Sequence, residues 1–369
     1  MPHPGGGEMS TLRRLRRLRV WLLAATAVVT LAALATFAGI QSTVAGVRAG
    51  TAPAVLEVVA AQDALVEADN AVVISFHTGQ AALIGPGERH QSELVTARQS
   101  LAQVAEHNAA GAEGSRALQV VEGLLAGYAN FVEQADAHYR QPETRMLGAA
   151  DLWYASRLMH APDNGILVRL GALADLQHTA LREQLSGGWL APAVAALWLL
   201  PALALLGLLG YAQFELRRRF RRRWNFWLAG ATAVLLGLIV TTSFGFGSAS
   251  GAKDAGSTVD MAVAEWRSGA VAEAAAARPE LVSLLRDHCG PDCGGVVDEL
   301  AATIPDGGAA PAATAGDPAD DGRRVTQELA AADLPAFTEY LIAGLGLAIA
   351  GLVVAGFRRR IDEYRFRST

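Results

Sequence analysis

The sequence predicts an all-α membrane protein with four transmembrane helices. Three observations indicate this: 51% of the 369 residues are hydrophobic, four apolar segments are long enough to cross a bilayer, and the arginines gather in three short blocks beside those segments. A helix rises about 1.5 Å per residue and the hydrocarbon core is roughly 30 Å thick, so about 20 apolar residues suffice. The predicted spans are residues 20–40, 189–211, 224–246 and 336–357.

The arginine blocks predict the orientation of these spans. Residues 1–19, 212–223 and 358–369 hold 16 of the 31 Lys and Arg residues and only four acidic ones, which leaves the rest of the chain near −17. Because short basic segments stay inside, we expect both termini and the 212–223 loop on the cytoplasmic side of the plasma membrane. The first span also fits a signal peptide, whose cleavage would leave the orientation of the rest unchanged.

The larger outer segment, residues 41–188, carries apolar residues at helical spacing. The first expected helix can continue out of the first span and should end at Gly79 or at Gly85-Pro86-Gly87. The expected helices run through residues 55–76, 94–104, 118–132 and 152–181, the last interrupted at Pro162-Asp163-Asn164-Gly165. Four helices with short turns predict an extracytoplasmic up-down-up-down four-helix bundle.

The smaller outer segment, residues 247–335, predicts a second, smaller helical domain. Its expected helices cover residues 258–277, 280–288 and 296–304. Residues 305–322 are rich in Gly, Ala, Pro and Asp and have too little apolar surface to offset the entropy of ordering, so they are expected to form a flexible linker.

The two cysteines, Cys289 and Cys293, lie four residues apart around a Gly-Pro turn. In an oxidising outer compartment this arrangement predicts a structural disulfide that closes a helix end. Two alternatives remain open. A redox-active pair would depart from the usual two-residue spacing, and a metal site that includes His288 would lack a fourth ligand in the sequence.

No catalytic or cofactor-binding motif is apparent, so we expect no enzymatic activity, cofactor or bound metal. The cytoplasmic pieces are too short to fold alone, and the outer segments lack a phosphate loop, a nucleophile elbow and a metalloprotease histidine pair. The outer histidines lack ligand spacing and are expected to be hydrogen-bonded or solvated: His77, His90, His107, His138, His160 and His178. Five aromatic residues would line a small-molecule pocket or form the bundle core: Tyr128, Phe131, Tyr139, Trp153 and Tyr154.

The spans contain no charge near their centres, and their one acid, Glu339, lies at an outer edge. This argues against an ion channel or a proton-coupled transporter. Small residues four apart, Gly344 with Ala348 and Gly351 with Ala355, suit close packing between spans or between protomers of a homo-oligomer.

The basic blocks are expected to fix topology and to contact anionic membrane lipid. Nothing in the charge pattern predicts a nucleic-acid partner. The C-terminal block also fits a cytoplasmic partner, because apolar and aromatic residues lie among its arginines. The candidate contacts are Arg358, Arg359, Arg360, Ile361, Tyr364 and Arg365.

Two stretches resemble known sensory proteins. Residues 62–70 (QDALVEADN) leading to Phe76-His77-Thr78-Gly79 look like the start of four-helix sensory bundles of the chemoreceptor type. The whole plan, with residues 358–365 (RRRIDEYR) after the last span, is similar to GlnX-like tetraspan membrane proteins of actinobacteria. The resemblance implies a relay from an extracytoplasmic amino-acid-binding lipoprotein to the cytoplasmic Ser/Thr protein kinase G. The cysteine pair and the acidic linker depart from the family pattern.

These features predict a non-enzymatic transmembrane signal relay. Binding outside would shift the equilibrium between two bundle packings and move the short inner segments by a small piston or rotation. The alternative is a structural or accessory subunit of a membrane transporter or a cell-envelope complex.

Overall fold

The computed structural model describes residues 6–190, 192–220, 226–274, 276–289, 295–302, 327 and 337–365. These residues form helices, and no strand occurs among them. The chain divides into two compact units. The membrane unit comprises Met1–Ala45, Gln184–Ala252 and Ala331–Thr369, and the bundle unit comprises Gly46–Glu183 and Lys253–Ala330.

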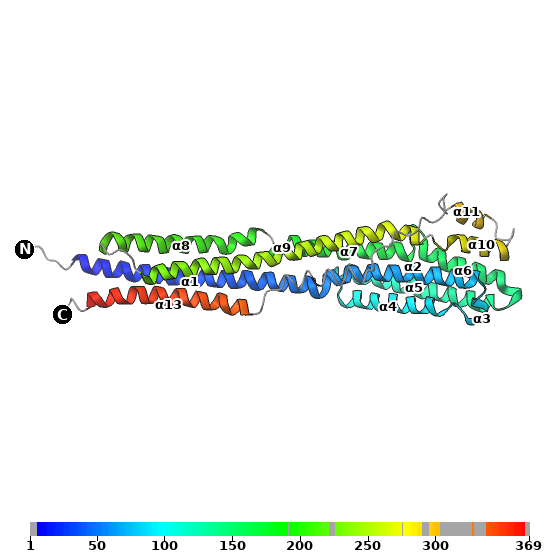
Figure 1. The fold of residues 1–369 in the computed structure, drawn as a ribbon, viewed down its shortest axis with the longest axis horizontal. Coiled ribbons are helices and arrows are strands. Elements are labelled where there is room, and N and C mark those ends of the chain that lie inside the picture. The colour runs from blue at the N-terminus through cyan, green and yellow to red at the C-terminus, as the bar shows by residue number, and fades with distance from the viewer. Residues whose placement is uncertain are drawn as a thin grey trace, which may run out of the picture. The chain divides into compact units, whose positions relative to one another are not determined.

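The described part of the membrane unit consists of α1, α8, α13 and the part of α9 before Lys253, labelled in Figure 1. Their bounds are Gly6–Gly46 for α1, Pro192–Phe220 for α8, Phe226–Ala274 for α9 and Phe337–Arg365 for α13. Within the described residues, four helical segments are long and apolar enough to cross a membrane: Arg16–His77, Ala196–Glu215, Phe226–Ser243 and Phe337–Arg358. The predicted all-α membrane protein with four spanning helices is therefore confirmed.

The interior of the membrane unit is apolar and tightly packed. It draws on all four helices, with Leu22, Phe37, Trp198, Leu205, Leu235, Ile349 and Phe357 among its buried members. The close helix contact falls at Gly346, where a Cβ atom would overlap the Thr30 side chain of α1. Gly344 and Gly351, which the spacing had indicated, have no such neighbour within 4 Å. Packing of Gly344 and Gly351 against another protomer stays a prediction.

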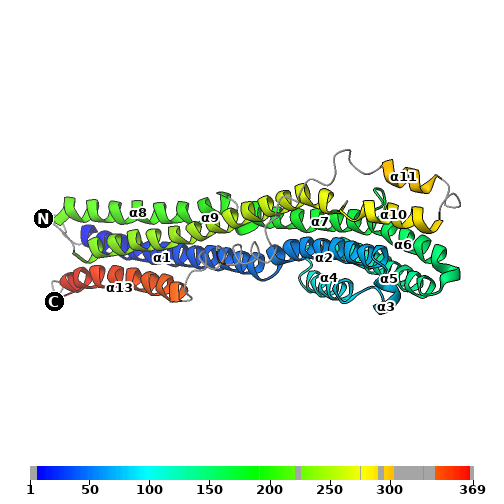
Figure 2. The same cartoon turned by 45° about the vertical axis from the view of Figure 1, so that its right-hand side comes forward.

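The bundle unit has four antiparallel helical runs. They are α2 (Ala52–His77), α4 (Glu88–Glu106), α5 (Gly111–Tyr139) and a broken fourth run of α6 (Arg145–His160) and α7 (Ile166–Ser186). The one-turn helix α3 (Ala81–Ile84) lies between α2 and α4. Figures 1 and 2 show each run returning alongside the one before it. This is the up-down-up-down order that the sequence predicted.

The breaks between these helices follow from local backbone chemistry. Helix α2 ends at His77, and Gly79 follows with φ 75°, a left-handed conformation that glycine adopts without strain. Helix α6 ends before Pro162, because a proline disfavours the helical conformation of the residue before it. Ala161 accordingly leaves the helix with φ −57° and ψ 129°.

The described helices of the smaller outer segment join the same core as the bundle. Helix α10 (Arg278–Cys289) packs on α2 and α6, and α11 (Val296–Ala302) packs on α10. Leu281, Leu285 and Val297 belong to one hydrophobic cluster with the four-helix core. Such short helices cannot bury an apolar face alone, so they add to an existing core. The segment treated as a second domain thus has its described helices on the bundle, and the expected linker 305–322 lies outside the described residues.

Helix α9 is longer than the sequence analysis expected. We expected a span ending near residue 246 and a separate helix from residue 258, but α9 runs as one helix from Phe226 to Ala274. The intervening residues 247–257 contain glycine, serine and alanine but no proline. Glycine weakens a helix only by about 1 kcal/mol, whereas proline removes a backbone donor and breaks it.

Candidate functional site

A buried carboxylate lies in the core of the bundle unit. Asp69 of α2 is only 2% exposed. Its Oδ2 atom accepts hydrogen bonds from Ser156 Oγ at 3.0 Å and from His160 Nε2 at 2.9 Å, both on α6. Its Oδ1 atom has no hydrogen-bond partner among the described residues. A buried carboxylate is costly unless it is paired, so the Asp69–His160 contact fixes how α2 packs against α6.

Tyr128 of α5 and Arg278 of α10 complete the surroundings of Asp69. The Tyr128 side chain is fully buried, and its hydroxyl forms no hydrogen bond of good geometry among the described residues, although it lies close enough to Asp69 to interact with that carboxylate. Burial, and then the negative charge of Asp69, raise the pKa of Tyr128 well above its usual value. Burial lowers the pKa of Arg278, while the charge of Asp69 opposes that shift. We call Asp69, Tyr128, Ser156, His160 and Arg278 the Asp69 cluster.

His90 of α4 lies beside this cluster. It is 3% exposed, and its Nδ1 atom lies 2.9 Å from the Ala68 carbonyl, so Nδ1 carries the proton and donates it. Its ring centroid is 6.1 Å from that of Tyr128. Burial lowers the pKa of His90, and the Ala68 carbonyl and the charge of Asp69 only partly oppose this.

The lowered pKa of His90 predicts acid sensitivity of the bundle unit. Below pH 6.5, the ordinary value for histidine, the unfolded chain takes up a proton that the folded chain resists. The free energy of unfolding should therefore fall as pH drops from 6.5 towards the folded pKa, by at most about 1.4 kcal/mol per pH unit for one group. Hydrogen exchange of α2 and α4 in the full-length protein in micelles, at pH 7.5 and 5.5, measures this loss.

Two matched variants test whether His90 causes this pH dependence of stability. His90→Asn keeps a donor near the Nδ1 position and removes the titratable group, so it should reduce the difference between the two pH values. His77→Asn removes an exposed histidine at the end of α2 and should leave that difference unchanged. Equal pH dependence in wild type and His90→Asn would contradict this assignment.

The six histidines of the bundle sequence are hydrogen-bonded or exposed, as expected. His160 and His90 have the partners given above, His138 pairs with Asp151 at 2.6 Å, His107 contacts the Gln103 carbonyl, His178 pairs with Asp260, and His77 is exposed. Among the described residues, no group of three or more His, Cys, Asp or Glu side chains is arranged to hold a metal ion.

The five aromatic residues divide between core and surface. Tyr128 and Tyr139 are buried, and the Tyr139 hydroxyl donates to the Phe76 carbonyl at 3.0 Å. Tyr154 is 48% exposed. Phe131 stacks on Tyr154 with centroids 5.9 Å apart, and Trp153 contacts Tyr154 edge-on at 4.7 Å. The five side chains therefore line no common pocket.

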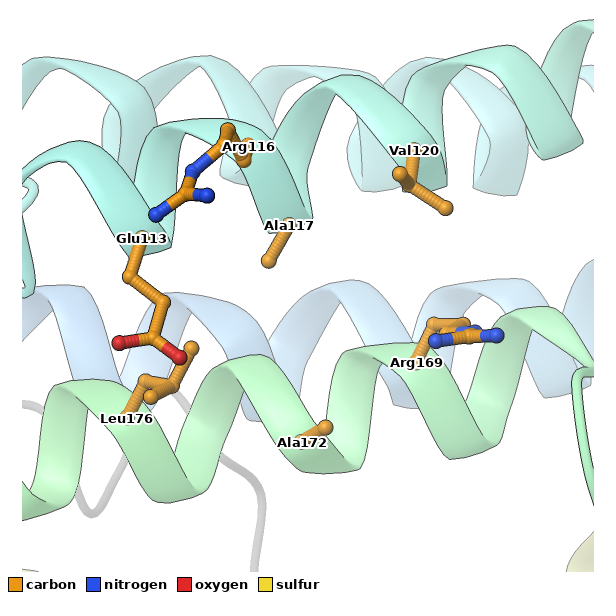
Figure 3. Close-up of a pocket in the computed structure, with 7 residues that line it drawn as sticks. All are labelled: Glu113, Arg116, Ala117, Val120, Arg169, Ala172 and Leu176. Atoms are coloured by element: carbon orange, nitrogen blue, oxygen red, sulfur yellow. The ribbon is translucent and has the colours of Figure 1, made fainter.

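A shallow groove of about 270 Å³ runs between α5 and α7. Figure 3 shows its walls, formed by Glu113, Arg116, Ala117 and Val120 of α5 and by Arg169, Ala172 and Leu176 of α7. The Glu113 side chain reaches towards Leu176, and the short side chains of Ala117 and Ala172 leave space between the helices. Arg116 Nε donates to the Ala112 carbonyl at 3.2 Å, which holds that side chain along its own helix.

No residue of the predicted disulfide or of the candidate partner segment is among the described members of the Asp69 cluster or of the groove lining. Cys289 is the last residue of α10, but its side chain and the whole of Cys293 lie outside what the structure describes, so the disulfide stays a prediction. Helix α13 extends to Arg365 and therefore includes the whole candidate partner segment, with Arg358 exposed. The side chains of residues 359–365 lie outside the described part.

Comparison with known proteins found one domain family that resembles the bundle. Residues 43–186 match the model of the actinobacterial sensor domain. The matched range covers α2 to α7 and thus contains the bundle, the groove and all of the Asp69 cluster except Arg278. No curated protein and no solved structure matched the chain. The four apolar helices indicate a membrane protein, and the match of residues 43–186 to a sensor domain supports a sensing or signalling role.

Proposed function

We propose that the protein is a non-enzymatic transmembrane signal relay, which passes the state of an extracytoplasmic solute-binding partner to a cytoplasmic partner such as a Ser/Thr protein kinase. The match of the bundle to a sensor domain supports this proposal most directly. The three arginine-rich blocks flank the apolar spans, which supports a cytoplasmic location for both termini.

The helices that leave the bundle provide the mechanical connection. Helix α1 continues through a π-helical turn, Val47–Thr51, into α2. The hydrogen bonds of a π-helical turn run one residue further than those of the flanking α-helix. Such turns often occur at functional sites. A change in how α2 packs in the bundle would then pass along α1 as a small shift or rotation.

The Asp69 cluster supplies a contact that differs between two packings. Asp69 lies on α2, and both of its hydrogen-bonding partners lie on α6. Displacing α2 along α6 would separate the Asp69 carboxylate from His160. Because this hydrogen bond would be lost at intermediate positions, the bundle would favour the position of α2 in which the bond is formed. Ligand or partner binding that stabilises the other position would shift the population towards it.

Cross-linking in native membranes, followed by purification of the full-length protein, tests the relay. We expect recovery of a solute-binding lipoprotein together with a Ser/Thr kinase. Replacing Arg358, Arg359 and Arg360 by Gln should reduce recovery of the kinase while the lipoprotein is retained. The same substitution at Arg221, Arg222 and Arg223 is the matched control and should retain both partners. Recovery of transporter or envelope components alone would contradict the relay and favour the accessory-subunit function.

A further inference from the structure

We propose that the first turns of helix α4 form a switch that responds to acidification outside the cell, with His90 as the residue that binds the proton. The proposal rests on the sensing function and names a stimulus for it. It concerns a folded bundle in which only the start of α4 moves, and is therefore distinct from a loss of overall stability at low pH.

His90 occupies a position that disfavours a positive charge. Its side chain is 3% exposed, and its Nδ1–H donates to the Ala68 carbonyl of α2 at 2.9 Å. His90 is the third residue of α4, so the partial positive charge at the helix N-terminus also opposes protonation. A buried neutral histidine takes up a proton more readily once it reaches water, so acid favours a state in which His90 is exposed.

The charges around His90 do not remove this cost. The charge of Asp69 favours the protonated ring, but burial has the larger effect and lowers the pKa of His90. The other members of the Asp69 cluster already interact with that carboxylate. The titratable and charged groups of other helices near this part of α4 include Glu67 and Asp69 of α2, Tyr128 of α5, His160 of α6 and Arg278 of α10.

The start of α4 is joined to the preceding chain through two glycines that can act as a hinge. Gly85 and Gly87 flank Pro86 and have φ of 82° and 98°, conformations that residues with a side chain rarely adopt. Gly85 is held on α2, because Ser75 Oγ donates to its carbonyl at 3.3 Å. Gly87 directly precedes α4, so a rotation there would move His90 while Gly85 stays in place.

The apolar face of α4 limits the extent of the movement. Four of its apolar side chains are buried in the bundle core: Leu94, Ala97, Leu101 and Val104. Exposing all four would cost far more than one proton can supply. The first turns are held more weakly, by His90 and by the ion pair of the largely exposed Arg89 with Glu67, which contributes little. Residues 88–92 can therefore separate from α2 while the rest of α4 stays packed.

Movement of these turns would change the support of α2, the helix that continues through the π-helical turn into α1. Helix α4 packs chiefly on α2, and Figures 1 and 2 show the two helices side by side. His90 binds the α2 backbone at Ala68, next to Asp69. Loss of this contact removes a bond that fixes α2 at the level of the Asp69 cluster, so acidification would favour a different position of α2.

Double electron–electron resonance of the spin-labelled full-length protein in nanodiscs, at pH 7.5 and 5.5, tests the switch. In a chain with Cys289 and Cys293 replaced by serine, one label is placed at Ala126 of α5 and the other at Gln91 or Gln99 of α4, all exposed positions. Since an exposed histidine has a pKa near 6.5, a second Gln91–Ala126 distance population should grow by up to about tenfold at pH 5.5. The Gln99–Ala126 distance should be the same at both pH values.

Two histidine variants assign the movement to His90. His90→Asn is neutral at both pH values and keeps a donor near the Nδ1 position, so its Gln91–Ala126 distances should not depend on pH. His77→Asn removes an exposed histidine of α2 and should respond to pH as wild type does. The difference between the two pH values is the quantity compared, so His90→Asn stays informative even where its packing differs from that of wild type.

Three outcomes would each overturn the switch: unchanged Gln91–Ala126 distances in wild type, a retained pH response in His90→Asn, or an equal response at Gln99. The last outcome would indicate a general loosening of α4 rather than a movement of its first turns. The labels report on α4 alone, so a negative result leaves the co-purification test of the relay unaffected. Failure to recover the two partners would equally leave the measured movement of α4 unchanged.

Discussion

Replacing His160 by leucine is expected to reduce the free energy of unfolding of the bundle by about 1–3 kcal/mol, because it takes a hydrogen-bond donor away from a buried carboxylate. Asp69 is 2% exposed, and Ser156 Oγ would remain as a donor to its Oδ2 atom. Hydrogen exchange of α2 and α6 in the full-length protein measures the loss, which should appear as faster exchange on both helices.

A double-mutant cycle separates the energy of the Asp69–His160 contact from the energy of packing the His160 side chain. The variant Asp69→Asn with His160→Leu no longer buries a charge, so it should be more stable than His160→Leu alone. The expected coupling energy lies in the range of about 0.5–3 kcal/mol that contacting residues show. Additive effects of the two substitutions would contradict a direct interaction between Asp69 and His160.

Replacing Gly148 by alanine is expected to destabilise the contact between α5 and α6 by about 1–3 kcal/mol, the usual cost of overpacking a core. A Cβ atom at Gly148 would lie 2.8 Å from the Tyr139 backbone nitrogen and 2.9 Å from the Ala135 carbonyl oxygen. Backbone atoms cannot rotate away as side chains do, so α5 and α6 would have to separate. The thermal unfolding midpoint of the full-length protein, followed by circular dichroism, should fall.

Gly123→Ala provides a control with the opposite sign. Gly123 lies within α5, and a Cβ atom there meets no neighbour within 4 Å. Alanine is a better helix former than glycine by about 1 kcal/mol, so this variant should be as stable as wild type or more so. A Gly148→Ala protein as stable as Gly123→Ala would show that the two helices do not approach closely at this position.

Much of the fold follows from local features of the sequence. The four spans are identified by the length of uncharged apolar segments, and the stops at Gly79 and Pro162 follow from residues with strong backbone preferences. The packing of α10 on the bundle could not be predicted in this way. Its apolar residues indicate a buried face but do not specify which helices cover it, and here α2 and α6 do.

The candidate site was harder to predict than the fold. Asp69 and His160 are 91 residues apart in the chain, and no short motif joins them. One signal was available: Asp69 falls at helical spacing from Leu65, Val72 and Val73, so an acid lies on the apolar face of α2. The groove depends on small side chains at Ala117 and Ala172, and alanine is too common in this chain for these two to stand out.

The proposed relay depends on which side of the membrane the bundle and the termini lie, and site-directed labelling tests this most directly. In a chain with Cys289 and Cys293 replaced by serine, single cysteines are placed at Ser92 of α4 and at Arg358 of α13, both exposed positions. A membrane-impermeant maleimide should label Ser92→Cys in intact cells and Arg358→Cys only after the membrane is permeabilised. Labelling of Arg358→Cys in intact cells, with Ser92→Cys protected until permeabilisation, would contradict an extracytoplasmic sensor connected to cytoplasmic termini.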